Sequence, residues 1–287
     1  MLYFLLLLVV LSNAGETICY KNSKLQKHDE VLFGVTFWSF LLSLLTFIFF
    51  LFTGGDFFSG LDYMTILYIF LMSILNVFCI ISWSITSKNL PMSVAEGVSE
   101  IYIAILTFLS WLCFGGEIDV WDISLVLVLV LSCILLAFVQ KREKIKGNYK
   151  IGLIFLTIWV VFAVFKGLLP GIIAGSEMFS YIFLLNLFIF LEVNLYFLIR
   201  LKKFNNFLPT IRDPYLFGVG LSRVVSQIVV IILALTVNLG IIDAVGVLGL
   251  VLIMLYERFI MKNKISLKTI ILLIVITLSS GALALLA

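Results

Sequence analysis

The chain alternates long apolar stretches with short polar ones. Apolar runs near the ~20 residues that cross a bilayer fall at 2–20, 31–53, 63–86, 90–114 and 121–139, and then at 149–172, 177–199, 214–236, 239–260 and 267–287. The intervals between the runs are short, with ten residues in the strongly polar stretch KREKIKGNYK, which leaves no room for a soluble domain. The pattern predicts an all-α polytopic membrane protein with ten transmembrane helices.

Composition supports the same class. Of the 287 residues, 63% are hydrophobic and 12% are charged, whereas a soluble domain is about 45 to 50% apolar and about 25% charged. The four cysteines lie in separate apolar runs and read as small hydrophobic residues, and the single histidine lies in a charged connection. We therefore expect no metal, no cofactor and no disulfide framework.

The basic residues predict the orientation in the membrane. Seventeen of the 19 lysines and arginines lie in the odd-numbered connections between the runs, and the even-numbered connections have none. By the positive-inside rule the odd-numbered connections are cytoplasmic, so both termini should be extracytoplasmic. The basic connections are short and match what topology requires, so we expect no binding of nucleic acid.

The two halves of the chain, residues 1–144 and 145–287, resemble one another. LPMSVAEGVSEIYIAILTF in the first half aligns with LGIIDAVGVLGLVLIMLYE in the second, with Gly97 on Gly246. Because each half has five helices, the second half must enter the membrane from the opposite side. We therefore expect two inverted five-helix repeats, an arrangement of secondary transporters whose substrate site lies between the repeats.

Charged side chains within the apolar runs are the candidate functional residues, because a charge at the bilayer centre costs at least about 2.5 kcal/mol on insertion scales. They are five acids and two bases: Glu16, Glu96, Glu100, Glu192, Asp243, Lys166 and Arg223. Glu96 and Glu100 are four residues apart and share a face of a helix. A structural hydrogen bond or a bound proton is the alternative interpretation of each acid.

Depth along the runs suggests which charges meet. With a rise of about 1.5 Å per residue, Glu100 and Arg223 lie in the middle plane, so we expect Arg223 beside Glu100. Lys166 and Asp243 both lie in the outer half and form a plausible pair. Because two bases cannot neutralise five acids, at least three acids should be neutral or hold a proton or a cationic ligand.

This inventory predicts a proton-coupled or exchanging carrier. Glu16 or Glu100 is the expected coupling acid. A guanidinium binds a carboxylate through two hydrogen bonds, so Arg223 beside an acid suits a small zwitterion such as an amino acid. Gln227 and Asn76 are candidate hydrogen-bonding groups for the same substrate. The alternative is that Arg223 only neutralises a carboxylate and that both amides join helices.

Two stretches resemble a known family. Pro91-Met-Ser-Val-Ala-Glu-Gly-Val and the later Phe114-Gly-Gly-Glu117 resemble the third helix of small multidrug resistance proteins, P-x-S-x-A-Y followed by F-G-E, and the fourth helix of the EamA-like transporters. Glu16 lies where the small multidrug transporters keep a carboxylate that binds cations and protons. The chain is thus similar to the drug/metabolite transporter superfamily. That resemblance implies a plasma (inner) membrane transporter.

The chain departs from the multidrug pattern at the residues that would recognise substrate. Glu96 stands where that family has an aromatic residue, and Ser99 stands where it has a tryptophan. An aromatic cage for a lipophilic cation is therefore not expected at these positions. We expect a secondary active transporter of a small polar or zwitterionic metabolite, working by alternating access as a monomer or homodimer.

Other functions stay open at this point. A flippase for a lipid-linked or phosphorylated substrate would use Arg223, Lys166 and the acids at a phosphate, and a multidrug or cation exporter would use the acids alone. An enzyme acting on a lipid head group lacks a nucleophile or metal constellation in the sequence. Charges near mid-membrane argue against a bare scaffold, and saturable, gradient-coupled transport would argue against a channel.

Overall fold

A computed structural model describes residues 2–23, 27–56, 61–114, 119–141, 148–168, 178–201, 208–234, 242, 245–263 and 265–286. Within these residues the regular secondary structure is helical and contains no strand. Seven helices are long and apolar enough to cross a membrane, and two shorter apolar helices span Tyr149–Phe165 and Leu267–Leu283. The predicted all-α polytopic membrane fold is confirmed.

The helices follow the predicted runs closely. Those of the first half are α1 (Leu2–Asn22), α2 (His28–Phe52), α3 (Tyr63–Asn89), α4 (Met92–Ser99), α5 (Ile101–Phe114) and α6 (Val120–Lys141). Those of the second half are α7 (Tyr149–Leu168), α8 (Met178–Leu201), α9 (Leu208–Ile211), α10 (Pro214–Ala234), α12 (Gly249–Phe259) and α13 (Leu267–Leu286).

One predicted helix crosses as a single apolar span, Met92–Leu109, but contains a local irregularity. The run 90–114 forms two helices, α4 and α5, which are interrupted at Glu100. The Ser99 hydroxyl donates to the carbonyl of Glu96 at 2.7 Å, and the Ile103 N–H bonds to the Glu100 carbonyl three residues back at 3.0 Å. The turn at Glu100 is therefore tighter than an α-helical turn.

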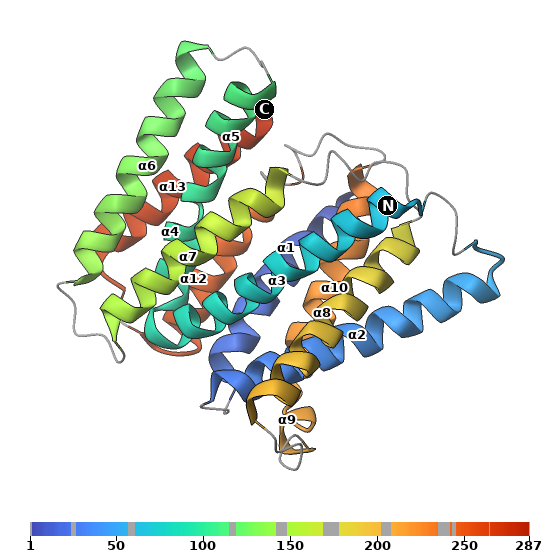
Figure 1. Cartoon of the computed structure of the whole chain (residues 1–287). Helices are drawn as coiled ribbons and strands as arrows, with labels where there is room; N and C mark the ends of the chain where they lie inside the picture. Colours follow the sequence, from blue (N-terminus) through green and yellow to red (C-terminus); the bar gives the residue numbers. More distant parts are fainter. Residues whose placement is uncertain are drawn as a thin grey trace.

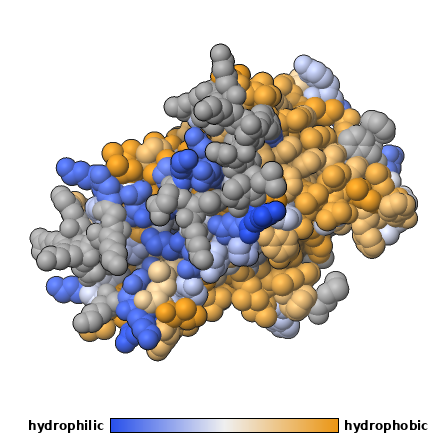
Figure 2. All heavy atoms as spheres, turned by 90° about the horizontal axis from the view of Figure 1, so that it is seen from below, coloured by the Kyte–Doolittle hydropathy of each residue, from blue (hydrophilic) through white to orange (hydrophobic). Residues whose placement is uncertain are grey.

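The helix ends that flank the predicted basic connections gather at one end of the helix bundle, which we call the basic end. The last turns of α1, α6 and α8 and the first turns of α2, α7 and α10 lie at this end, and both termini lie at the other (Figure 1). Seen from below, hydrophilic residues gather in one region of the surface, and hydrophobic residues cover much of the rest (Figure 2). Such an apolar belt is suited to lipid.

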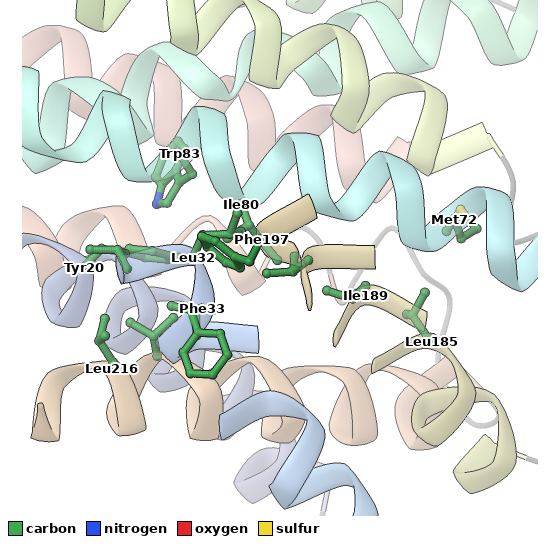
Figure 3. Close-up of a cluster of buried hydrophobic side chains, with 14 of the residues drawn as sticks. Tyr20, Leu32, Phe33, Met72, Ile80, Trp83, Leu185, Ile189, Phe197 and Leu216 are labelled. Carbon is green, nitrogen blue, oxygen red and sulfur yellow. The ribbon is translucent and has the colours of Figure 1, made fainter. Parts of the chain in front are cut away.

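The described helices bury two main hydrophobic cores. The larger is formed mainly by α1, α2, α3, α8 and α10, with Leu32, Ile80 and Phe197 at its centre (Figure 3), and it includes residues of α4 and α7. The second joins α4, α5, α6, α12 and α13. α4 therefore lies at the boundary, with Ala95 in the larger core and Val94 in the second.

Most of the strong helix pairings join the first half of the chain to the second. α1 packs against α10, α3 against α7, α2 against α8, and α6 against α13, while α4 packs against α12. Small residues allow the closest approaches. A Cβ at Gly15 of α1 would lie 3.0 Å from the Ser222 hydroxyl of α10, so a larger residue at Gly15 would push these helices apart.

Candidate functional site

An ion pair joins α1 to α10. The Nη1 of Arg223 lies 3.2 Å from Oε1 of Glu16, and the side chains are 12% and 25% exposed, respectively. The Nη2 of the same guanidinium reaches Oδ1 of Asn76 on α3 at 3.5 Å. Three helices from both halves of the chain therefore meet at one guanidinium.

The expected partner of Arg223 was Glu100, and the structure corrects this expectation by pairing Arg223 with Glu16. α10 packs along α1, α2 and α8, so its polar face meets the acid of α1. Glu100 lies instead at the α4–α5 interruption, and the helices on either side of it pack against α6, α7, α12 and α13. Depth in the membrane was estimated from the sequence, but lateral neighbours depend on helix packing.

Glu96 lies on the other side of α1. The hydroxyl of Thr17, the residue after Glu16, donates to a carboxyl oxygen of Glu96. Two adjacent residues of α1 thus contact ionisable side chains from different helices: Glu16 contacts Arg223 of α10, and Thr17 contacts Glu96 of α4. Glu96 belongs to α4, which contributes to both hydrophobic cores, and Arg223 belongs to α10, which contributes to the larger one. Of the predicted site residues, Glu16, Glu96 and Arg223 therefore come together around α1.

The helix interruption frees backbone groups close to these acids. The carbonyl of Gly97, which a continuous helix would use, accepts from the Cys133 thiol of α6 at 3.3 Å. A second interruption precedes α12, where Leu248, Leu250 and Val251 bond to the carbonyl three residues back at 3.0, 3.0 and 3.1 Å. Both interruptions lie in the segments whose sequences align between the two halves.

The second interruption packs directly on α1. A Cβ at Gly246 would lie 3.0 Å from Nδ2 of Asn13, and one at Gly249 would lie 3.4 Å from the carbonyl oxygen of Val10. Gly246 and Gly249 thus allow the backbone of this segment to approach α1. Asn13 in turn accepts a long hydrogen bond of 3.5 Å from the Ser226 hydroxyl of α10.

Exposure falls steadily along the polar face of α1. Asn13 is exposed, Glu16 is partly exposed, and Thr17 and Tyr20 are 2% and 1% exposed. These residues run from the end that holds the termini toward the basic end. The Glu16–Arg223 pair is therefore partly exposed, while Thr17 and Tyr20, which follow it along α1, are buried.

A pair of hydrogen-bonded amides joins α8 to α10, and one of them, Gln227, lies one turn along α10 from Arg223. Nδ2 of Asn186, on α8, donates to Oε1 of Gln227 at 3.0 Å. Within the described residues, Oδ1 of Asn186 and Nε of Arg223 are buried and have no hydrogen-bond partner. A buried donor and a buried acceptor without partners are groups that a bound ligand could satisfy.

Asn186 is absent from the sequence-based candidates. The signal was present, because an amide in an apolar transmembrane run is as unusual as Asn76, which the sequence analysis did select. Glu192 lies elsewhere, on α8 against Ser73 of α3, whose hydroxyl is its hydrogen-bond partner. The suggested pair of Lys166 and Asp243 lies outside the described residues, apart from the backbone of Lys166 in α7.

Sequence reasoning also missed Glu257, at the end of α12. This buried carboxylate accepts from the backbone N–H groups of Met92 and Ser93 at 2.7 and 3.2 Å and from the Ser93 hydroxyl. These N–H groups open α4, so Glu257 caps that helix from another one. Lys21 of α1 donates to the carbonyls of Ser87 and Leu90 at 2.7 and 2.8 Å on the other side of the same turn.

Comparison with protein-family models gives one match. The model of the EamA-like transporter family matches residues 1–138, which include α1 to α5 and most of α6. No curated protein matches the chain. Among the described residues, no group of three or more His, Cys, Asp or Glu side chains could hold a metal ion.

Proposed function

We propose that the chain is a membrane transporter of the drug/metabolite type that carries a small polar or zwitterionic metabolite, because residues 1–138 match the model of the EamA-like transporter family. The proposed mode is secondary active transport, proton-coupled or by exchange. The observation that carries the proposal is the partly exposed Glu16–Arg223 ion pair, which Asn76 contacts. Gln227, one turn along α10 from Arg223, bonds to Asn186 of α8.

Electrostatics favours a zwitterion at such a pair. A ligand carboxylate can take the Arg223 guanidinium while a ligand ammonium takes Glu16, so both protein charges keep a partner. A monovalent ion would satisfy one protein charge and leave the other buried without a counter-ion, which is unfavourable. Nε of Arg223 and Oδ1 of Asn186 supply one further donor and one further acceptor.

Contacts between helices at the basic end are suited to a carrier that works by alternating access. Among these, Nδ2 of Asn22 donates to the Tyr256 hydroxyl at 2.8 Å, which joins α1 to α12. In the proposed cycle, such contacts close the basic end in one state and break in the other.

The helix pairings support two inverted repeats as the basis of this motion. With the halves divided after residue 144, α1–α10 and α7–α3 are equivalent pairs, each joining the first helix of one half to the third of the other. The pairs α2–α8, α4–α12 and α6–α13 each join a helix to its own counterpart. Helices that are interrupted near the substrate site are frequent in such carriers. In this chain the interruptions lie at Glu100, between α4 and α5, and just before α12.

The test is ligand-dependent thermal stability of the purified protein. Amino acids, quaternary amines, nucleobases and sugar phosphates are compared on the wild type, Glu16→Gln, Arg223→Lys and the control Glu30→Gln, whose carboxylate pairs with Lys27 outside the site. A ligand at a hundred times its Kd adds about 2.7 kcal/mol. We expect stabilisation by one zwitterion class, retained in Glu30→Gln and lost in the other two variants.

Other outcomes would redirect the proposal. Stabilisation by quaternary amines that survives Arg223→Lys but not Glu16→Gln would assign a cation exporter. Stabilisation by sugar phosphates that Arg223→Lys abolishes would assign a phosphorylated or lipid-linked substrate.

A further inference from the structure

A second intramembrane acid, Glu192, lies away from the ion pair. It is the fifteenth residue of the 24-residue α8 and contacts the buried Ser73 of α3. Its surroundings are apolar, since the neighbouring rings of Phe70 and Phe188 pack edge to face at 5.7 Å. Glu192 is therefore a carboxyl group at the boundary between α3 and α8.

The helices around Glu192 provide no cation for it. α8 packs against α2, α3 and α10, and in the sequence α3 has no charged residue before Lys88 and α2 has none after Glu30. Arg223 is the single basic residue of α10, and it pairs with Glu16. The remaining titratable groups of these elements are Tyr63, Tyr68, Cys79, Tyr181, Tyr196 and Tyr215, together with His28, Asp29 and, eight residues beyond Glu192 in the last turn of α8, Arg200.

The one polar contact described for Glu192 offers it little stabilisation as an anion. The Ser73 hydroxyl donates to the carbonyl of Phe70 at 2.7 Å and also to Glu192. A serine hydroxyl has one proton, so it can serve only one of these two oxygens at full strength. A carboxylate in apolar surroundings with only a shared hydrogen bond favours its neutral form.

Access to Glu192 is from the side of the bundle. Leu191 and Leu195 of the same helix are 52% and 57% exposed, and Phe70 of α3 is also exposed. Leu195 lies three residues from Glu192 and so shares its helix face. Exposed apolar side chains on membrane-spanning helices face lipid, so a hydrophobic molecule dissolved in the bilayer can reach this boundary.

We propose that Glu192 is a neutral carboxylic acid that forms a proton-binding site separate from the Glu16–Arg223 pair and open to the lipid. Such a group reacts with hydrophobic carbodiimides such as dicyclohexylcarbodiimide. The acid gives its proton to one reagent nitrogen and its oxygen forms a bond to the central carbon. The acyl group then moves to nitrogen as the carbon–oxygen bond breaks, so one whole reagent molecule is added and nothing leaves.

The test is peptide mapping of the full-length protein after treatment with this reagent in liposomes. We expect modification at Glu192, lost in Glu192→Gln, and none at Glu257, whose carboxylate is buried and accepts three hydrogen bonds. Modification should fall with rising pH, by up to about tenfold per unit once the carboxyl group ionises. This readout requires no transport, so it stands or falls independently of the proposed substrate.

The stability of the variants gives a second readout. Glu192→Gln keeps a neutral donor for the Ser73 oxygen, so its unfolding midpoint should match that of the wild type. Wild-type protein without modification at Glu192, even in mildly acidic buffer, would overturn the proposal. So would equal total modification in Glu192→Gln. If Glu192→Gln does not fold, the site of modification in the wild type decides alone.

Discussion

Charged side chains have different kinds of partner at the α3–α4 turn, which lies at the basic end, and in the Glu16–Arg223 pair inside the bundle. At the turn, Lys21 meets carbonyls where α3 ends, and Glu257 meets N–H groups where α4 begins. Lys21 therefore faces the negative end of the α3 dipole, and Glu257 faces the positive end of the α4 dipole. Inside the bundle, two side-chain charges meet each other, and a neighbouring donor and acceptor are left without partners within the described residues.

The difference separates a structural use of charge from a functional one. Backbone groups cannot leave a helix end, so the charges at the turn have partners that are fixed in place. A side-chain ion pair that is partly exposed can exchange either partner for a ligand group. The α3–α4 turn is thus suited to hold the two hydrophobic cores together, and the ion pair is suited to bind.

The largest expected effect is that of Glu257→Ala. The substitution leaves two buried N–H groups and the Ser93 hydroxyl without their acceptor, and it removes the negative charge nearest to Lys21. We expect a loss of about 3 kcal/mol in the free energy of unfolding, measured by denaturant unfolding in detergent. Glu30→Ala is the control, and an equal loss there would show that Glu257 has no special role.

Arg223→Ala should have the next largest effect on stability, about 1 to 2 kcal/mol. Glu16 loses its counter-ion but is 25% exposed and can take up a proton or keep some hydration. The same variant should lose all stabilisation by ligand, whereas Glu257→Ala should keep it. A ligand response that survives Arg223→Ala would place the binding site elsewhere.

The sequence predicted the membrane class and the helix order because long apolar runs and basic connections are local signals. It did not predict that Arg223 pairs with Glu16, since depth along a helix does not define which helix lies alongside. The interruption at Glu100 was missed because no proline after Pro91 marks it within this run. The role of Glu257 was missed because its partners are backbone groups 164 and 165 residues away.

Alanine substitutions at Gly97 and Gly249 compare the packing of the second core with the packing of the site segment against α1. A Cβ at Gly97 would lie 2.7 and 2.8 Å from methyl groups of Leu273 and Leu136, inside the second core, whereas one at Gly249 would make ordinary contact with α1 at 3.4 Å. We expect Gly97→Ala to cost about 1 kcal/mol, because overpacking exceeds the gain in helix propensity. Gly249→Ala should leave the unfolding midpoint nearly unchanged. A reversed order would contradict the packing described here.

Asp62 provides the smallest expected effect and the sharpest contrast with Glu257. Both carboxylates cap a helix, but Asp62 does so in solvent at the end that holds the termini, where it accepts from the Thr65 N–H at 2.6 Å. The hydrogen bonds from Thr65 hold the pKa of Asp62 below its usual value. Its contribution is therefore present above the pKa of the unfolded chain, about 3.9, and is lost as the pH falls through the lower folded value.

The measurement is amide hydrogen exchange at the first turn of α3, compared between the wild type and Asp62→Ala. Exchange should be faster in the variant near neutral pH, and the difference should shrink when the wild type is acidified below the pKa of Asp62. Global stability should hardly respond, because an exposed cap can be replaced by water, whereas the buried cap of α4 cannot. If Asp62→Ala instead destabilised the whole protein as much as Glu257→Ala, burial would not explain the difference between the two caps.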